Sequence, residues 1–262
     1  MYTQFRFEIF KRLMITNSKR YKLKITVVTV VYNAFDTIES TVKSVLEQTY
    51  RNIEYIIIDG LSSDGTLERI KSLILDTETI LVSERDMGIY DAMNKALRCA
   101  DGDYLIFINA GDIFFNSDVL KSVEKRIGEN LNLIYYGDAY YANKDTDKQT
   151  FRGGLFSKYR LAISNICHQT IFYPKKVYKR SSYNLEYKLQ ADYAYNLENY
   201  THTRFVYMPL IIAVYDDQGI SSTTKDLTFA NDHLKLTLKS LGWSAVLYRF
   251  AYSIMKRLNI IT

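Results

Sequence analysis

The sequence predicts an α/β fold in which a mostly parallel, doubly wound sheet is flanked by helices. Across the first half of the chain, short apolar runs alternate with amphipathic stretches of about a dozen residues, a pattern typical of parallel strands joined by helical crossovers. The chain has 262 residues, of which 47% are hydrophobic and 24% charged. It is therefore long enough to bury one large core.

The first strand is predicted at residues 24–31, where the run KITVVTVV is rich in β-branched side chains. Such a continuous run is typical of a strand that is buried on both faces. Residues 36–48 follow with apolar residues at helical spacing, and Asp64 lies where an N-cap is expected before a second helix at residues 66–75. The other elements predicted in this half are strands at 53–58, 79–82 and 103–108 and a helix at 88–100.

The second half of the chain has a less regular pattern. Its predicted elements are helices at 117–127 and 191–200, strands at 133–141, 168–173 and 203–207, and a polar loop at 143–149. From Asp226 onward the spacing of apolar residues is helical to the end, with a break near Gly242. We therefore expect a C-terminal helical extension beyond the sheet.

The net charge of +5 is unevenly distributed. Residues 1–24 carry seven Lys and Arg against one acid, and residues 225–262 carry six against two. The middle of the chain is therefore acidic on balance. This distribution argues against a nucleic-acid partner and favours basic ends that touch an anionic surface.

Several function classes lose support because their signatures are absent. The chain has no G-x-G-x-x-G or P-loop motif, no G-x-S-x-G elbow and no H-E-x-x-H, which argues against dehydrogenases, P-loop NTPases, serine hydrolases and zinc proteases. Its two cysteines, Cys99 and Cys167, have neither disulfide nor metal-site spacing. No apolar run approaches the roughly 18 residues of a membrane span, and no signal-peptide core is visible. We therefore expect a cytoplasmic protein.

Polar residues follow the predicted strand at 103–108, in the order Asn109-Ala-Gly-Asp112. Because α/β folds bind ligands at the carboxyl ends of their strands, the carboxylate of Asp112 is expected at a ligand site. Upstream, Asp86 opens a helical stretch that holds Asn94 and Lys95. Polar groups around a helix N-terminus suit a nucleotide diphosphate and a hard metal ion.

A second polar segment follows the strand predicted at 53–58. Asp59 stands at the end of that strand, and Asp64-Gly-Thr66 begins the next helix. An acid at a strand end can accept a hydrogen bond from the N–H group of a uracil-like base. For Asp64, a plain N-cap is the stronger interpretation.

Four segments in this order resemble a family 2 glycosyltransferase with the GT-A fold: VVTVVYNAFDTIESTVKSVLEQTY, IIIDGLSSDGT, SERDMGIYDAMNKAL and GDYLIFINAGDIF. The resemblance is strong over residues 24–115 and weaker over 116–222. It points to the bacterial branch that builds capsule, exopolysaccharide and O-antigen chains. It implies a nucleotide-sugar donor, usually a UDP-sugar, and a divalent cation, Mg²⁺ or Mn²⁺.

The resemblance also implies roles for individual residues of the first half. Nucleotide-sugar contacts fall on Val30, Tyr32, Asn33, Asp59, Asp86, Asn94, Lys95, Asn109 and Gly111. Asp112 matches the final acid of an Asp-x-Asp type motif and is the implied metal ligand. This chain departs from that motif, because Gly111 precedes Asp112 and Asn109 stands where an acid can occur.

In the second half, Gln190-Ala-Asp192-Tyr resembles an acidic motif at the start of a helix that faces the sugar. An inverting transfer needs one carboxylate to take the proton of the acceptor hydroxyl. Asp192 is the predicted base, with Glu186 and Glu198 as weaker candidates. His168 and Gln169 lie in a segment common in this branch and are assigned to the diphosphate or the acceptor. A buried, hydrogen-bonded histidine is an equal alternative for His168.

The predicted organisation has four parts. Residues 1–23 form a basic amphipathic segment, 24–115 the nucleotide-sugar-binding half, 116–224 the acceptor-binding half, and 225–262 the C-terminal amphipathic helices. Within the third part, residues 218–221 resemble a stretch that folds over bound nucleotide. The basic, aromatic-rich ends can lie in a membrane interface, or they can pack on the catalytic domain or on a second copy in a homodimer.

The sequence therefore predicts a metal-dependent inverting glycosyltransferase, transferring a hexosyl or N-acetylhexosaminyl group to a glycan or lipid-linked acceptor. We expect it in the cytoplasm, with peripheral contact at the inner membrane. One alternative is an inactive nucleotide-sugar-binding partner of another transferase, which the altered Asn109–Asp112 motif favours. A nucleotidyltransferase is the other alternative, but it would be expected to carry a basic, Gly-rich loop where this chain has Val31-Tyr-Asn-Ala34.

Overall fold

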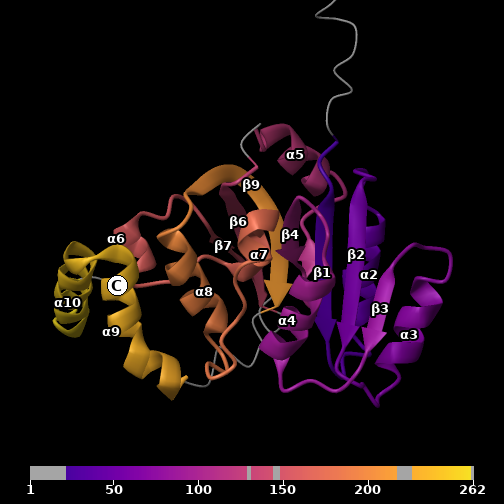
Figure 1. The fold of residues 1–262 in the computed structure, drawn as a ribbon, viewed down its shortest axis with the longest axis horizontal. Helices are drawn as coiled ribbons and strands as arrows, with labels where there is room; N and C mark the ends of the chain where they lie inside the picture. Colours follow the sequence, from indigo (N-terminus) through magenta and orange to yellow (C-terminus); the bar gives the residue numbers. More distant parts are fainter. Residues whose placement is uncertain (1–21, 129–130, 144–147, 217–225, 261–262) are drawn as a thin grey trace, which may run out of the picture.

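The computed structural model describes residues 22–128, 131–143, 148–216 and 226–260. Two predicted segments, residues 1–21 of the basic N-terminal part and residues 218–221, lie outside this range. Figure 1 shows the parallel strands of the first half of the chain on the right and the two C-terminal helices at the far left. The strands are β1 (Ile25–Val31), β2 (Ile53–Asp59), β3 (Ile80–Ser83), β4 (Tyr104–Phe107), β5 (Ile113–Phe114), β6 (Ile134–Asn143), β7 (Lys148–Arg152), β8 (Ile171–Pro174) and β9 (Phe205–Asp216). The helices are α2 (Ile38–Leu46), α3 (Thr66–Leu73), α4 (Ile89–Cys99), α5 (Val119–Arg126), α6 (Lys158–Leu161), the 3₁₀ helix η1 (His168–Thr170), α7 (Lys175–Tyr178), α8 (Ala191–Tyr200), α9 (Leu227–Leu241) and α10 (Trp243–Arg257).

Strand β1 explains why a continuous apolar run forms a strand here. All seven of its residues are buried. Successive side chains of a strand point to opposite faces. Val28 and Val30 accordingly join the core that contains α4, whereas Val27 and Val31 join the core that contains α2 and α3. Because helices cover both faces of the sheet, its inner strands are apolar throughout. The predicted α/β fold with flanking helices is confirmed.

The strand order of the first half positions the site. β2 and β4 lie parallel to β1 on its two sides, and β3 lies parallel to β2 on the outside. The winding therefore changes direction at β1, and a ligand crevice is expected outside the carboxyl ends of the strands at such a switch point. The segments that follow β1, β2 and β4 begin at Tyr32, Gly60 and Ile108 and meet at this edge.

Beyond β4 the sheet continues as β8, β6, β9 and β5, and β7 pairs with β6. β8 is antiparallel to both β4 and β6, and β9 is parallel to β6. The polar loop predicted at 143–149 is wrong in part, because Lys148–Arg152 forms β7 beside β6. An edge strand can be polar, so the sequence of β7 lacks the apolar pattern by which a strand is predicted. The strand predicted at 168–173 begins only at Ile171, since residues 168–170 form η1.

The C-terminal helices differ in how they pack. α9 places Phe229, Leu236 and Leu241 in the same core as α8. It ends at Gly242, whose φ of +81° lies in the region that favours glycine. The α10 helix buries only Ala245 and Val246. None of the helices in the described part of the chain combines the length and apolar character that crossing a membrane requires.

Candidate functional site

The loop after β1 is tied to the loop after β2 by a set of hydrogen bonds. Asn33, with a positive φ of 47°, accepts from the amide of Ser63 at 2.9 Å and donates its own amide to the Ser62 hydroxyl at 2.8 Å. The side chain of Tyr32 remains 64% exposed beside this junction. Tyr32 and Asn33, two of the predicted nucleotide-sugar residues, therefore lie on a loop that is held by hydrogen bonds, and the aromatic ring of Tyr32 is exposed. The third, Val30, buries its side chain in the core below and accepts from the amide of Ala110 at 3.2 Å.

Asp59 lies at the carboxyl end of β2 and is fully buried. Its carboxylate accepts the hydroxyl of Ser83 at 2.6 Å and the amide of Ser62 at 3.3 Å. These contacts join the ends of β2 and β3. The side chain thus supports the loop after β2 from a buried position.

Gly60 is a site residue that the sequence did not single out, because a glycine after a strand is typical of any turn. A Cβ atom there would lie 2.5 Å from Oδ2 of Asp86 and 3.3 Å from the ring of Tyr32. Asp86 in turn accepts the amide of Gly88 at 2.9 Å. The absence of a side chain at Gly60 therefore brings Asp86 and Tyr32, from separate loops, to one point.

Asn94 and Lys95, the two predicted site residues on α4, contact segments outside the loops that follow β1, β2 and β4. Asn94 exchanges two hydrogen bonds with the backbone of Tyr183, at 2.9 and 2.8 Å. Lys95 donates to the carbonyl of Arg85 at 2.6 Å and pairs with Glu84 at 3.1 Å. Both side chains hold α4 to its neighbouring segments. Their hydrogen bonds among the described residues do not include other predicted site residues.

The turn after β4 carries Asn109, Gly111 and Asp112. Gly111 has a φ of +99°, and its amide donates to the hydroxyl of Thr41 at 3.0 Å. The side-chain oxygen of Asn109 is buried and has no hydrogen-bond partner in the described structure. Asp112 is buried and accepts the side-chain amide of Gln169 at 2.8 Å. This hydrogen bond brings η1, from the second half of the chain, to the end of β4.

His168 is buried beside this turn. Its ring stacks on Phe107 of β4 with the centroids 5.0 Å apart, and neither ring nitrogen has a partner within the described residues. Burial lowers the pKa of His168, and the nearby carboxylate of Asp192 acts in the opposite direction. The imidazole is therefore neutral at neutral pH. Two unpaired ring nitrogens in a buried position are an unfilled hydrogen-bonding capacity, which is unusual in a merely structural histidine.

Asp192 lies in the first turn of α8 and is held on both sides. Its Oδ2 accepts the side-chain amide of Asn165 at 2.7 Å, and its Oδ1 lies 2.9 Å from the hydroxyl of Tyr90. That hydroxyl also lies 2.8 Å from the carbonyl of Leu189 and shares its one proton between the two acceptors. Burial, together with the adjacent carboxylate, raises the pKa of Tyr90, so its hydroxyl stays a donor. Neither Tyr90 nor Asn165 was singled out from the sequence, since only tertiary contacts reveal them. Tyr90 belongs to the first turn of α4, four residues after Asp86, and thus links the two halves of the site.

The described residues contain no group of three or more His, Cys, Asp or Glu side chains that could hold a metal ion. The donors present at the end of β4 are the carboxylate of Asp112 and the unpartnered amide oxygen of Asn109. Oxygen donors of this kind suit Mg²⁺, which is commonly bound by one or two carboxylates and retains several waters. The residues thus fit a cation that takes its remaining ligands from a diphosphate and water.

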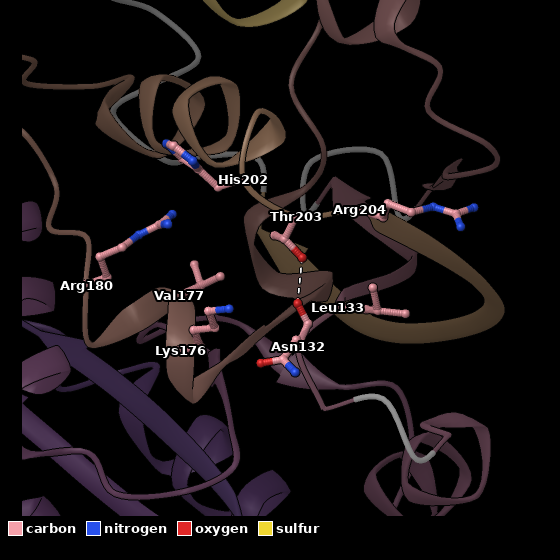
Figure 2. A pocket seen from close by; sticks show the side chains of 8 residues that line it. All are labelled: Asn132, Leu133, Lys176, Val177, Arg180, His202, Thr203 and Arg204. Carbon is pink, nitrogen blue, oxygen red and sulfur yellow. Dashed lines mark hydrogen bonds between the residues drawn. The ribbon is translucent and has the colours of Figure 1, made fainter.

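A separate surface hollow of about 200 Å³ carries several basic side chains (Figure 2). It is lined by Asn132, Leu133, Lys176, Val177, Arg180, His202, Thr203 and Arg204. Figure 2 shows the hydroxyl of Thr203 donating to the carbonyl of Asn132, at 2.5 Å. The hollow lies before β6 and β9 and beside α7, which follows the end of β8 that pairs with the start of β4. It is therefore on the opposite edge of the sheet, and no predicted site residue lines it.

Comparisons with known proteins identify the family and the fold of this chain. The model of Glycosyl transferase family 2 matches residues 26–186. A PGL/p-HBAD biosynthesis glycosyltransferase of Mycobacterium bovis is 33% identical over 206 residues, which cover 75% of this chain and 78% of the relative. The Escherichia coli UDP-Glc:alpha-D-GlcNAc-diphosphoundecaprenol beta-1,3-glucosyltransferase WfaP is 34% identical over 122 residues, or 46% of this chain and 47% of that protein.

Two solved structures share the fold at low sequence identity. S. aureus TarS 1–349 in complex with UDP-GlcNAc has a TM-score of 0.68 at 17% identity, with 83% of this chain and 66% of that chain covered. This chain thus spans just under two thirds of that fragment's length. The mannosyltransferase PcManGT from Pyrobaculum calidifontis, in complex with GDP-Man and Mn²⁺, has a TM-score of 0.58 at 18% identity and covers 93% of this chain and 69% of its own. The family match and the mycobacterial relative together show that this chain belongs to glycosyl transferase family 2.

Proposed function

We propose that this chain is an inverting glycosyltransferase that moves a hexosyl or N-acetylhexosaminyl group from a UDP-sugar to a glycan or lipid-linked acceptor. The observation that carries the proposal is the hydrogen bond between Tyr90 and Asp192. It places a carboxylate of the second half against the helix that follows Asp86 on the donor side. This contact supports a proposed base that adjoins the proposed donor site across the two halves of the fold.

The donor half is assigned from the loops after β1, β2 and β4. The exposed ring of Tyr32 would stack on the base, and Asp59 would accept a base N–H from beneath, with Asn33 holding the loop. Asp86, Asn109 and Gly111 would line the ribose, the sugar and the diphosphate. Val30, Asn94 and Lys95 support these loops through the contacts described above.

Asp112 is the proposed metal ligand, with the amide oxygen of Asn109 as a second oxygen donor. A bound Mg²⁺ or Mn²⁺ would supply charge neutralisation for the departing diphosphate. Gln169 positions the carboxylate of Asp112 through its amide. His168, neutral and with unpaired ring nitrogens, would accept from a hydroxyl of the sugar or acceptor, or donate to an oxygen.

Asp192 is the proposed general base. Tyr90 and Asn165 fix its two oxygens in place, so little reorganisation is needed when an acceptor hydroxyl approaches. The acceptor oxygen would form a bond to the anomeric carbon while the bond from that carbon to the diphosphate oxygen breaks. The proton of the hydroxyl passes to Asp192, and this single displacement inverts the anomeric configuration.

The acceptor class rests on the relatives. The WfaP name specifies a sugar on diphosphoundecaprenol as acceptor, and the mycobacterial name specifies PGL/p-HBAD biosynthesis. We extend this to a bacterial cell-surface glycan, built on a lipid carrier at the cytoplasmic side of the inner membrane.

One observation favours a second function. Asp112 is the sole acid of the altered motif, and the described residues contain no cluster of acidic or His side chains for a metal. A nucleotide-sugar-binding partner without activity would need no more than this. Slow release of sugar from a UDP-sugar in the presence of Mn²⁺ separates the two, because a pure binding protein would leave the donor intact.

The proposed donor site is tested by calorimetric titration of the protein with UDP, with and without MnCl₂. We expect binding that needs Mn²⁺ and that falls about tenfold or more in Asp112→Asn. Asp101→Asn is the matched control, since Asp101 is an exposed acid at the opposite end of β4, paired with Lys175. Equal UDP affinity in wild type and Asp112→Asn would overturn the assignment.

A further inference from the structure

The outward side of α10 carries an apolar stripe. The stripe consists of Trp243, Leu247, Phe250, Ile254 and Leu258. A spacing of three or four residues places these side chains on one side of a helix. Each of them is between 53% and 70% exposed. We call this stripe the outer face of α10.

The other side of α10 holds the helix to the protein. Ala245 and Val246 are buried, and Arg249 donates to the carbonyl of Ala162 at 2.9 Å and lies 3.3 Å from His233. Figure 1 shows α10 at the far left end of the molecule, away from the sheet. The orientation of α10 is thus fixed by its polar and small residues, and its large apolar residues are left outside.

The exposed charges on α10 and on its neighbour α6 have one sign. Residues 243–260 contain no acid, and beyond Arg249 on the inner side their basic residues are Lys256 and Arg257. Helix α6 adjoins α10 through Lys158, which donates to Ser244 at 2.9 Å, and it too contains basic residues and no acid. A second copy packed symmetrically on this face would bring like charges together, with no acid on α6 or α10 to pair with them. An anionic surface is the complement of such a face.

We infer that the outer face of α10 docks on an anionic lipid surface, with α10 lying in the plane of the interface. The apolar stripe would enter the boundary between headgroups and acyl chains, and the flanking Lys and Arg would contact the headgroups. α9, which places Phe229, Leu236 and Leu241 in the core, would remain with the protein. The inference stands on α10 and α6 alone and does not depend on the identity of the donor or the acceptor.

The chain offers a direct probe, because Trp243 is its single tryptophan. The full chain is mixed with vesicles of phosphatidylcholine, with or without phosphatidylglycerol, and tryptophan emission is recorded. We expect a blue shift with the anionic vesicles, quenching by brominated acyl chains, and weaker binding as salt rises because the charge is screened. Leu247→Glu should weaken vesicle binding about tenfold or more, since it puts a charge into the exposed stripe that the membrane would bury.

Leu75→Glu is the matched control. Leu75 is also a highly exposed leucine, 80% accessible, but it follows α3 at the other end of the molecule, so its substitution should leave vesicle binding unchanged. Lys256→Gln with Arg257→Gln should reduce both the affinity and its salt dependence. All these positions are exposed, and unchanged thermal unfolding will verify folding.

Three results would overturn the inference. The first is an unshifted Trp243 emission with anionic vesicles, including the case in which the protein floats with them through another segment. The second is equal binding by Leu247→Glu and Leu75→Glu. The third is a lipid-free dimer, seen by sedimentation, that Leu247→Glu dissociates, because a second copy would then cover the face.

Discussion

Asp192 is the final acceptor in a series of side-chain hydrogen bonds, each of which donates toward it. Tyr173 donates to Asn196 at 2.8 Å, Asn196 donates to Asn165 at 2.9 Å, and Asn165 donates to Asp192. Each member thereby fixes the orientation of the next, and the chain ends on a carboxylate that can only accept. Such a connected network holds a side chain in one position more firmly than isolated contacts would.

Asp192→Asn tests the proposed base. General-base assistance is worth about 10²–10⁴-fold in rate, so we expect kcat for transfer to fall in that range while UDP affinity stays unchanged. Glu198→Gln is the control, since Glu198 is an exposed acid on the same helix. Near-normal kcat in Asp192→Asn, or an equal loss in Glu198→Gln, would refute the role of Asp192.

Gly60→Ala tests the meeting of the two donor-side loops. The new Cβ would lie 2.5 Å from the carboxylate of Asp86, and this flexible side chain must move. We expect UDP affinity to fall by about 1–3 kcal/mol, the cost of leaving one polar partner unmatched, with little change in stability. Gly128→Ala, where a Cβ meets nothing within 4 Å, should bind UDP as wild type does. Calorimetry that finds the two variants alike would contradict this prediction.

Some residues of the candidate site can be predicted from their position in the sequence alone. Asp59 and Asp112 stand just beyond apolar runs, so their place at strand ends can be predicted. Gly60, Tyr90 and Asn165 cannot be found this way. Their roles come from contacts such as the one between Tyr90 and Asp192, which are far apart in the chain.

At the scale of elements, the start of α9 is linked to the start of α8. Oδ1 of Asp226 caps α9 by accepting the amide of Phe229 at 3.1 Å. Its Oδ2 accepts the amides of Leu189 at 2.9 Å and Gln190 at 3.3 Å. One carboxylate thus holds the segment that leads into Asp192, and α9 contributes to the site without reaching it.

Asp226→Asn and Asp226→Ala separate the two tasks of this residue. Asparagine keeps one acceptor oxygen for the helix cap but sets an amide group against Leu189. We therefore expect Asp226→Ala to lower the free energy of unfolding by about 0.5–2 kcal/mol from the cap alone, and Asp226→Asn to be less destabilised. Both should show reduced kcat with unchanged UDP affinity. If Asp226→Asn has a normal kcat, the residue acts on stability alone.

The packing of α9 against α10 predicts a pH effect on stability. Burial, and then the charge of Arg249, lower the pKa of His233 to about 3. Unfolding returns this histidine to its ordinary pKa of about 6.5. Between these values the unfolded state binds the extra proton, so stability falls as pH falls, by up to about 1.4 kcal/mol per pH unit.

His233→Gln removes that titration and keeps an acceptor for Arg249. Urea unfolding at pH 7 and pH 5 should show a smaller loss of stability in the variant than in wild type. Equal losses would mean that the pKa of His233 is the same in the folded and the unfolded protein.

Elements of the first half follow closely from their sequence, because a helix-covered parallel strand is an unbroken apolar run. The second half is harder to predict. β7 is a polar edge strand, and η1 turns a stretch of strand-like alternation toward Asp112. In both cases the tertiary position, not the local pattern, decides the structure.

At the scale of the whole molecule, the sequence predicts the fold class and the edge of the sheet at which the candidate site lies. The parallel order around β1 follows from alternating strands and helices. The pairing of β8 with both β4 and β6 does not, because it joins segments far apart in the chain without a local signal. Yet this pairing places η1 and its Gln169 beside Asp112.

The central claim is that this edge of the sheet binds a nucleotide sugar and that Asp192 removes a proton from the attacking hydroxyl. Both parts are tested together by real-time proton NMR of the wild-type protein with MgCl₂ and α-linked UDP-glucose, UDP-galactose or UDP-N-acetylglucosamine. Water serves as the acceptor. We expect the sugar released first from an accepted donor to be the β-anomer, and we expect Asp192→Asn to release almost none. First release of the α-anomer would rule out a single displacement, and equal release by Asp192→Asn would rule out Asp192 as the base.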